Sequence, residues 1–187
     1  FYKHTFLLYH ELKEPQLEVS SMGETGTEEY LEFSGGDVDF RVPASGYYFN
    51  NTDCWVRIEG DRAKVGLSDL IRLDPRRIIS FRPPRIGLAV SIFDSLCSFE
   101  TDGISLEVSA PLSGRVVSAN RELIENPGLV KQDPYGRGWV AELEIGDVED
   151  ELDFLSDCKV YFETAGARMR AGPRIGCPCS RRGGAQR

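Results

Sequence analysis

The sequence predicts a mainly β domain with the architecture of a sandwich or a barrel. Two observations lead to this prediction. Several short segments alternate apolar and polar residues, as half-buried strands do. Turn residues separate these segments at intervals of about 8–12 residues, which is typical of sandwiches and barrels. The length of 187 residues fits one such domain with appendages.

The first predicted hairpin joins a strand at Cys54–Glu59 to a strand at Ala63–Leu67. Gly60-Asp61 supplies the turn between these two strands. A further short strand is predicted at Arg77–Phe81. This strand ends before Pro83-Pro84, because proline has no N–H to donate to a strand ladder.

A second predicted hairpin joins strands at Ser95–Phe99 and Ile104–Val108. The sequence Asp102-Gly103 lies between them and favours a tight type I′ turn, since that turn needs a positive φ at both central residues. Another strand is predicted at Arg115–Ala119, after a turn at Ser113-Gly114. These strands supply most of the predicted β structure.

Two helices complete the predicted domain. Asn120 can cap a short helix that ends before Pro127, since the residue before a proline avoids the helical conformation. A turn at Asp133–Gly136 and a strand at Gly138–Ile145 follow. A C-terminal helix is predicted at about 149–163, and acids in its first turn suit the helix dipole better than a metal site. Its apolar positions are Leu152, Leu155, Val160 and Phe162, and its acids are Glu149, Asp150, Glu151 and Asp153.

The charge distribution excludes some classes of partner. The formal net charge of −8 argues against nucleic acid as the main partner. No apolar run approaches the roughly 18 residues of a membrane span, so no membrane partner is predicted. Residues 164–187 carry six arginines and no acid, whereas residues 1–40 carry nine acids and two lysines. The basic tail is either a mobile, solvated end or an arm that docks on an acidic partner or on the chain's own acidic front.

The five cysteines do not form a disulfide framework, because their number is odd and their spacing is uneven. Cys54, Cys97 and Cys158 lie among apolar residues and are predicted to be small buried core residues. Cys177 and Cys179 form a C-x-C pair in the basic tail and are weak candidates for metal or redox chemistry. A zinc site normally needs four ligands, and no second pair lies near them, since both histidines are at the other end of the chain.

One stretch of the chain resembles a known family. The run from Ser109 to Leu123 (SAPLSGRVVSANREL), followed by Asn126–Val130 and Asp133–Trp139 at the matching spacing, resembles the core of the glycine cleavage system H-protein. The segment Trp55–Asp61 resembles the first hairpin of that family. The resemblance implies a barrel-sandwich hybrid of two antiparallel sheets, a lipoyl-type domain with a short internal helix and a C-terminal helix. It assigns residues 40–163 to this domain, with an N-terminal extension at 1–39 and a basic Arg/Gly-rich tail at 164–187.

The family carries a lipoyl arm on one lysine at a hairpin tip, and this arm moves an aminomethyl group and electrons between the other proteins of the system. The resemblance places the attachment segment at Glu100–Gly103, without a gap between Gly66 and Pro111. The lysine position is therefore Gly103, which has no side chain to acylate. A second departure is Phe93, where the family tends to have a turn glycine.

The resemblance and its departures together predict a non-lipoylated interaction or scaffolding module without a cofactor and without a catalytic role. The expected partners are proteins, of the glycine-cleavage type or otherwise lipoate-linked, and the expected location is the cytoplasm or an organelle. The predicted contact surface is the loop after the short helix together with the hairpin tip, formed by Glu100, Thr101, Asp102, Gly103 and Ile104.

Two alternatives stay open at this point. The chain is a genuine lipoyl carrier if one of its five lysines is modified instead; these are Lys3, Lys13, Lys64, Lys131 and Lys159. The chain is a redox protein or an enzyme if Cys177 and Cys179 react, with or without Cys97. Nucleophilic catalysis by a thiol needs a base beside it, and neither His4 nor His10 is near a cysteine in the sequence.

Overall fold

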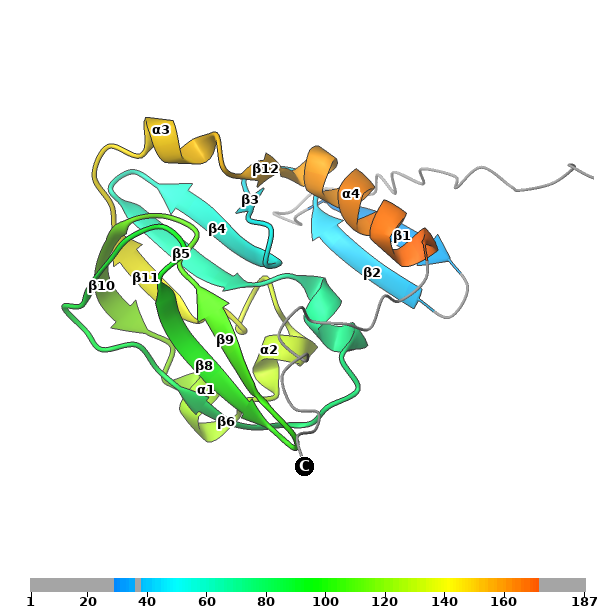
Figure 1. Ribbon diagram of the computed structural model, residues 1–187, viewed down its shortest axis with the longest axis horizontal. Coiled ribbons are helices and arrows are strands. Elements are labelled where there is room, and N and C mark those ends of the chain that lie inside the picture. Colours follow the sequence, from blue (N-terminus) through cyan, green and yellow to red (C-terminus); the bar gives the residue numbers. More distant parts are fainter. Residues whose placement is uncertain (1–28, 36–37, 172–187) are drawn as a thin grey trace, which may run out of the picture.

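The computed structural model describes residues 29–35 and 38–171 and is mainly β (Figure 1). The largest sheet has seven strands in the order β12-β3-β4-β5-β11-β10-β7. A second sheet has three strands in the order β6-β8-β9, and a third is the hairpin of β1 and β2. The strands of the seven-stranded sheet are β3 (Tyr48–Phe49), β4 (Cys54–Glu59), β5 (Arg62–Leu67), β7 (Ala89–Val90), β10 (Gly114–Ala119), β11 (Ala141–Glu144) and β12 (Ser156–Asp157). The remaining strands are β1 (Tyr30–Gly35), β2 (Val38–Pro43), β6 (Ile78–Arg82), β8 (Ser95–Thr101) and β9 (Ser105–Ser109).

The seven-stranded and three-stranded sheets enclose the main apolar core. Alternation along each strand sends every second side chain inward, as with Val56 on β4 and Val65 on β5. Phe99 on β8 and Val108 on β9 face them from the other sheet, and all four side chains are fully buried. The predicted strands at 54–59, 63–67, 77–81, 95–99, 104–108 and 115–119 are therefore confirmed, with ends that differ by one or two residues.

A second core of aromatic residues joins the N-terminal hairpin to helix α4 (Cys158–Arg170). Phe33 on β1 stacks on Phe40 of β2 at 4.9 Å, and Phe40 lies 5.7 Å from Phe162 of α4. Trp55 is buried in the same cluster, as its place in an alternating strand predicts. The hairpin crosses the expected boundary at residue 39 and α4 runs past residue 163, so the described parts of both appendages pack on the domain.

The C-terminal helical region differs from the prediction. The expected helix at 149–163 is wrong as a single element, because it is divided into α3 (Glu149–Leu152) and α4. The Asp157 side chain accepts a hydrogen bond from the Val160 N–H at 2.8 Å and so starts a new helix. Val160, predicted to be an apolar position of the single helix, is exposed on α4. The buried face of α4 is formed by Cys158, Tyr161, Phe162, Ala165 and Gly166.

Short helices lie in the connections from β5 to β6 and from β10 to β11. The predicted helix after Asn120 is α1 (Glu122–Glu125), and the Asn120 side chain accepts a hydrogen bond from the Glu122 N–H at 3.0 Å. Helix α2 (Leu129–Gln132) and the 3-10 helix η1 (Asp69–Leu73) were not expected from the sequence. None of the helices in the described ranges combines the length and the apolar character that crossing a membrane would need.

Candidate functional site

The predicted contact surface lies where β8 turns into β9, at the end of a projecting hairpin (Figure 1). Antiparallel pairing runs up to Glu100, which is opposite Ser105, and leaves four residues to make the tip. On its other edge β8 pairs with β6, where Ile78 is opposite Thr101. The tip is thus supported on one side by β6 and is otherwise directed away from the core.

The Thr101 side chain closes the turn. Its backbone N–H donates to the Ile104 carbonyl at 3.0 Å, and its hydroxyl donates to the same oxygen at 2.7 Å. The Ile104 N–H in turn donates to the Thr101 hydroxyl oxygen at 3.2 Å. Thr101 is only 8% exposed, so these bonds are partly shielded from water. The tip is therefore held in one shape by side-chain bonds as well as by the strand ladder.

The expected type I′ turn is wrong. Neither Asp102 nor Gly103 is among the described residues with a positive φ, whereas a type I′ turn requires a positive φ at both. The reason is that the Thr101 hydroxyl takes the Ile104 N–H, which in a type I′ turn would bond to the Thr101 carbonyl. Gly103 is therefore not required for backbone reasons, and a Cβ added there would meet no atom within 4 Å.

The surface around the tip is mixed in character. The half-buried Glu100 carboxylate lies 3.1 Å from the exposed Arg82 guanidinium, and a pair so open to solvent contributes little to stability. Asp102 is exposed, and Ile104 exposes 46% of its surface. The tip thus presents an exposed isoleucine close to an exposed carboxylate.

An open hollow of about 550 Å³ lies beside this hairpin, on the side of β6. One wall is the segment Arg76–Ile79, and the other is the loop between α1 and α2, which is the predicted contact loop. Lys131 lines the hollow and donates to the carbonyl oxygens of Asp74 (2.6 Å) and Arg76 (2.7 Å), which holds α2 against the first wall. The sequence did not indicate this hollow, because its walls are about fifty residues apart in the chain.

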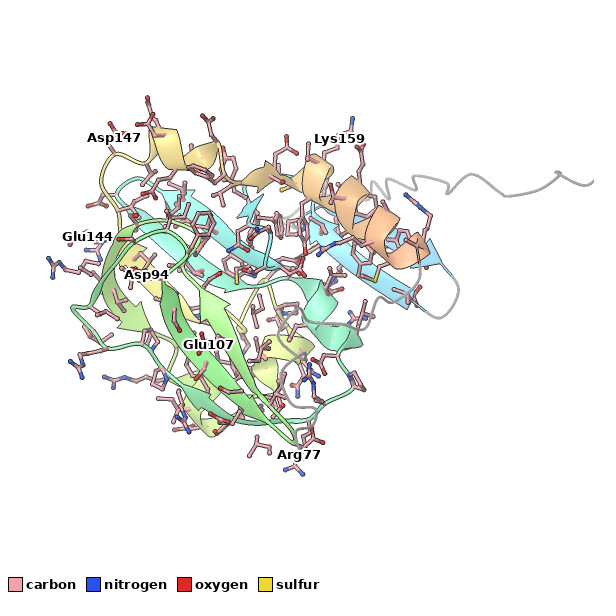
Figure 2. All side chains as sticks on the ribbon, in the orientation of Figure 1. Arg77, Asp94, Glu107, Glu144, Asp147 and Lys159 are labelled. Atoms are coloured by element: carbon pink, nitrogen blue, oxygen red, sulfur yellow. The ribbon has the colours of Figure 1, made fainter. Side chains whose placement is uncertain are left out.

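Arg76, which lines the hollow, forms an ion pair with Asp74. The Arg76 Nε lies 2.9 Å from one carboxylate oxygen of Asp74 and 3.1 Å from the other. Hydrogen bonds from Arg76 hold the pKa of Asp74 below its usual value. The exposed Arg77 lies near the hairpin tip (Figure 2), so this end of the molecule presents cationic groups beside the apolar Ile79.

The described lysines lie away from the tip. Lys64 is in the middle of β5, opposite Arg57 and Glu142. Lys131 is bound to two backbone carbonyls, and Lys159 is on α4, at the other end of the molecule from the hairpin (Figure 2). A lipoyl arm needs an exposed amine at the end of a projecting segment, and none of these three lysines has that position. Lys3 and Lys13 lie outside the described residues.

Three of the five cysteines lie in the part of the chain that the structure describes. Cys54, Cys97 and Cys158 are buried, as predicted, and burial raises the pKa of each thiol, which opposes reactivity as a thiolate. Cys177 and Cys179 lie outside the described residues. Within residues 29–35 and 38–171, no group of three or more His, Cys, Asp or Glu side chains is placed to hold a metal ion.

Comparisons with known proteins agree with the motif reading. The family model described as "Glycine cleavage H-protein" matches residues 47–167. A glycine cleavage system H protein of Carboxydothermus hydrogenoformans is 37% identical over 107 residues, which are 57% of this chain and 82% of the relative. A probable glycine cleavage system H protein 1 of Sulfolobus acidocaldarius is 33% identical over 115 residues, 62% of this chain and 83% of the relative. The crystal structure of an H protein from Mycobacterium marinum shares the fold, with a TM-score of 0.56, 22% identity, and coverage of 65% of this chain and 98% of that one.

Proposed function

The chain belongs to the glycine cleavage H-protein family, and from this premise we propose that it is a member without a lipoyl arm that acts as a protein–protein interaction or scaffolding module. Proteins of this family are carriers and not enzymes. The proposal concerns what a carrier fold does when its attachment residue is missing. Function has to be argued from the site, since a fold alone does not determine it.

The single observation that carries the proposal is Gly103. The resemblance puts the lipoyl-lysine position on this residue, and lipoate is attached through an amide that requires a primary amine. The turn does not need a glycine for its φ, and there is open space for a side chain. The loss of the lysine is therefore not a requirement of the local backbone, and the fold around it is kept.

The contact surface that we propose is the hairpin tip together with the hollow beside β6. The tip offers the exposed Ile104 and Asp102, and the hollow offers Ile79 and Arg77. We propose that the partners are proteins of the glycine-cleavage type or other lipoate-linked proteins, because the parts of the fold flanking the tip resemble those of the carriers. We further propose a cytoplasmic location, which the three buried cysteines without disulfides support.

The test is to produce the full chain with lipoate and a lipoate-attaching enzyme and to measure its intact mass. We expect no added lipoyl group on the natural sequence and one on the variant Gly103→Lys. Gly146→Lys is the matched control, because Gly146 also lies in open space without a positive φ but is not on the hairpin. This control should stay unmodified.

Two results would contradict the proposal. A lipoyl group on any lysine of the natural chain would support the alternative, a genuine carrier with an unrecognised attachment site. An unmodified Gly103→Lys variant would show that the assigned register of the tip is incorrect.

For the scaffolding role, purified glycine-cleavage proteins are applied to the immobilised chain. We expect the double variant Asp102→Lys, Ile104→Ser to weaken capture roughly tenfold.

A further inference from the structure

Two exposed phenylalanines touch near the start of β8, the strand whose other end forms the hairpin tip. Phe93 exposes 49% of its surface and Phe154 exposes 61%. Their rings meet edge to face, with centroids 5.9 Å apart and an interplanar angle of 83°. Large aromatic side chains bury much area when a partner covers them, so an exposed pair in contact is a feature of interaction surfaces rather than of ordinary solvent-facing positions.

The backbone fixes Phe93 in this exposed place. Its φ is +73°, a left-handed conformation that L side chains rarely adopt. The turn is nevertheless well bonded, because the Phe93 N–H donates to the Ala110 carbonyl at 2.8 Å and the Ser91 N–H donates to the Asp94 carboxylate at 2.8 Å. A glycine would fit this φ without strain, so the phenylalanine is not explained by the turn itself.

The segment that carries Phe154 is attached to the same turn. The Glu151 carboxylate of α3 accepts a hydrogen bond from the Ser113 N–H at 2.7 Å. The Ser113 hydroxyl oxygen accepts one from the Ile92 N–H at 2.9 Å. These two bonds hold α3 and the turn as one surface, so the phenylalanine pair is preorganised and not a chance contact between loops.

The two segments that carry the pair are rich in acidic residues. Residues 145–158 contain six acids and no lysine or arginine. Asp150 and Asp153 precede Phe154 in the sequence and are exposed, and Asp94, which follows Phe93, is also exposed. We call Phe93, Phe154, Asp94, Asp150 and Asp153 the aromatic–acidic patch. Figure 2 places Asp147 beside α3 and Arg77 near the hairpin tip, with Asp94 between them.

We propose that the aromatic–acidic patch is a second docking surface, which binds a segment of a partner protein that carries arginine or lysine beside apolar side chains. Carboxylates attract such a segment, and the faces of the two rings accept both apolar groups and guanidinium or ammonium groups. A second copy of this chain is a poorer occupant, since a symmetric contact would bring two acidic patches together. An anionic membrane surface is repelled for the same reason.

The patch is independent of the proposed contact at the hairpin tip. Strand β8 runs from the turn at Phe93 to the tip, and its seven residues span about 23 Å. A partner at one end therefore leaves the other end open. Failure of the lipoylation test would leave this proposal unchanged, and the reverse also holds.

The experiment titrates the full chain with a short synthetic peptide of alternating arginine and leucine. Its counterpart has glutamate in place of arginine. Amide resonances of residues 91–94 and of α3 should shift with the first peptide only. The variants Phe93→Gly and Phe154→Ser should each weaken binding roughly fivefold to tenfold. Ile124→Ser is the control, because Ile124 is 54% exposed on α1 and lies outside the patch.

Thermal unfolding separates loss of binding from loss of fold. Phe93→Gly relieves the positive φ, so this variant should keep or raise the melting temperature while it loses affinity. Equal binding of the natural chain and both phenylalanine variants would overturn the proposal, and so would equal binding of the two peptides. Self-association that Phe154→Ser abolishes, measured by sedimentation, would show that a second copy is the occupant and would also overturn it.

Discussion

The Thr101 hydroxyl determines the shape of the hairpin tip, and Thr101→Val tests this directly. Valine keeps the shape and the methyl group of threonine but can neither donate to the Ile104 carbonyl nor accept from the Ile104 N–H. Each such bond contributes about 0.5–1.5 kcal/mol net. Because Ile104 is 46% exposed and water can replace part of the loss, we expect a total near the lower half of the sum, about 1–2 kcal/mol.

Urea unfolding, followed by tryptophan fluorescence, measures this change. With a slope of about 2 kcal/mol per molar urea, the midpoint should fall by roughly 0.5–1 M. Hydrogen exchange of the Ile104 amide gives a local readout, because only that N–H loses its acceptor. Thr101→Ser is the matched control, since it keeps both bonds and loses one methyl group. An Ile104 amide that exchanges at the same rate in the valine variant, the serine variant and the natural chain would refute the reasoning.

Two further predictions concern the aromatic cluster. A Cβ at Gly66 would lie 2.4 Å from the ring of the buried Trp55. Gly66→Ala should therefore lower the free energy of unfolding, measured in urea, by about 1–3 kcal/mol. An unchanged urea midpoint would contradict this packing. Burial raises the pKa of Tyr161 in the folded state, so the unfolded chain loses this proton first and stability falls as pH rises above about 10. Tyr161→Phe should reduce that slope by up to about 1.4 kcal/mol per pH unit in alkaline denaturation, whereas an unaltered slope would exclude the phenol as its source.

Strands were predictable because their signal is local. Every second side chain along Cys54–Glu59 and Arg62–Leu67 faces the main core, as the sequence pattern predicts, and the paired strands have nearly the predicted bounds. The position of the hairpin tip also followed, since Asp102-Gly103 separates two such patterns. In these cases the residues that decide the secondary structure all lie within one short segment of the sequence.

The rest depended on contacts between distant segments or on competition between bonds. The turn type at Asp102 was decided by a threonine hydroxyl that competes with the backbone, which Asp-Gly statistics do not describe. The predicted helix at 149–163 is divided because Asp157 caps a new helix, α4, by accepting the Val160 N–H. The acidic run before Asp157 had suggested one continuous helix. The contact of Phe93 with Phe154 brings together two turns sixty residues apart, so no local pattern could reveal it.

The stacking of Phe33 on Phe40, and of Phe40 near Phe162, has a practical consequence for anyone trimming this protein. A fragment limited to residues 47–167, the segment that matches the family model, would lack Phe33 and Phe40. The ring of Phe162 would then be exposed to solvent. Each lost burial is worth about 1.5–3 kcal/mol, a large share of the margin by which a domain of this size stays folded. The segment that matches the family model is thus shorter than the segment that packs together as one folded unit.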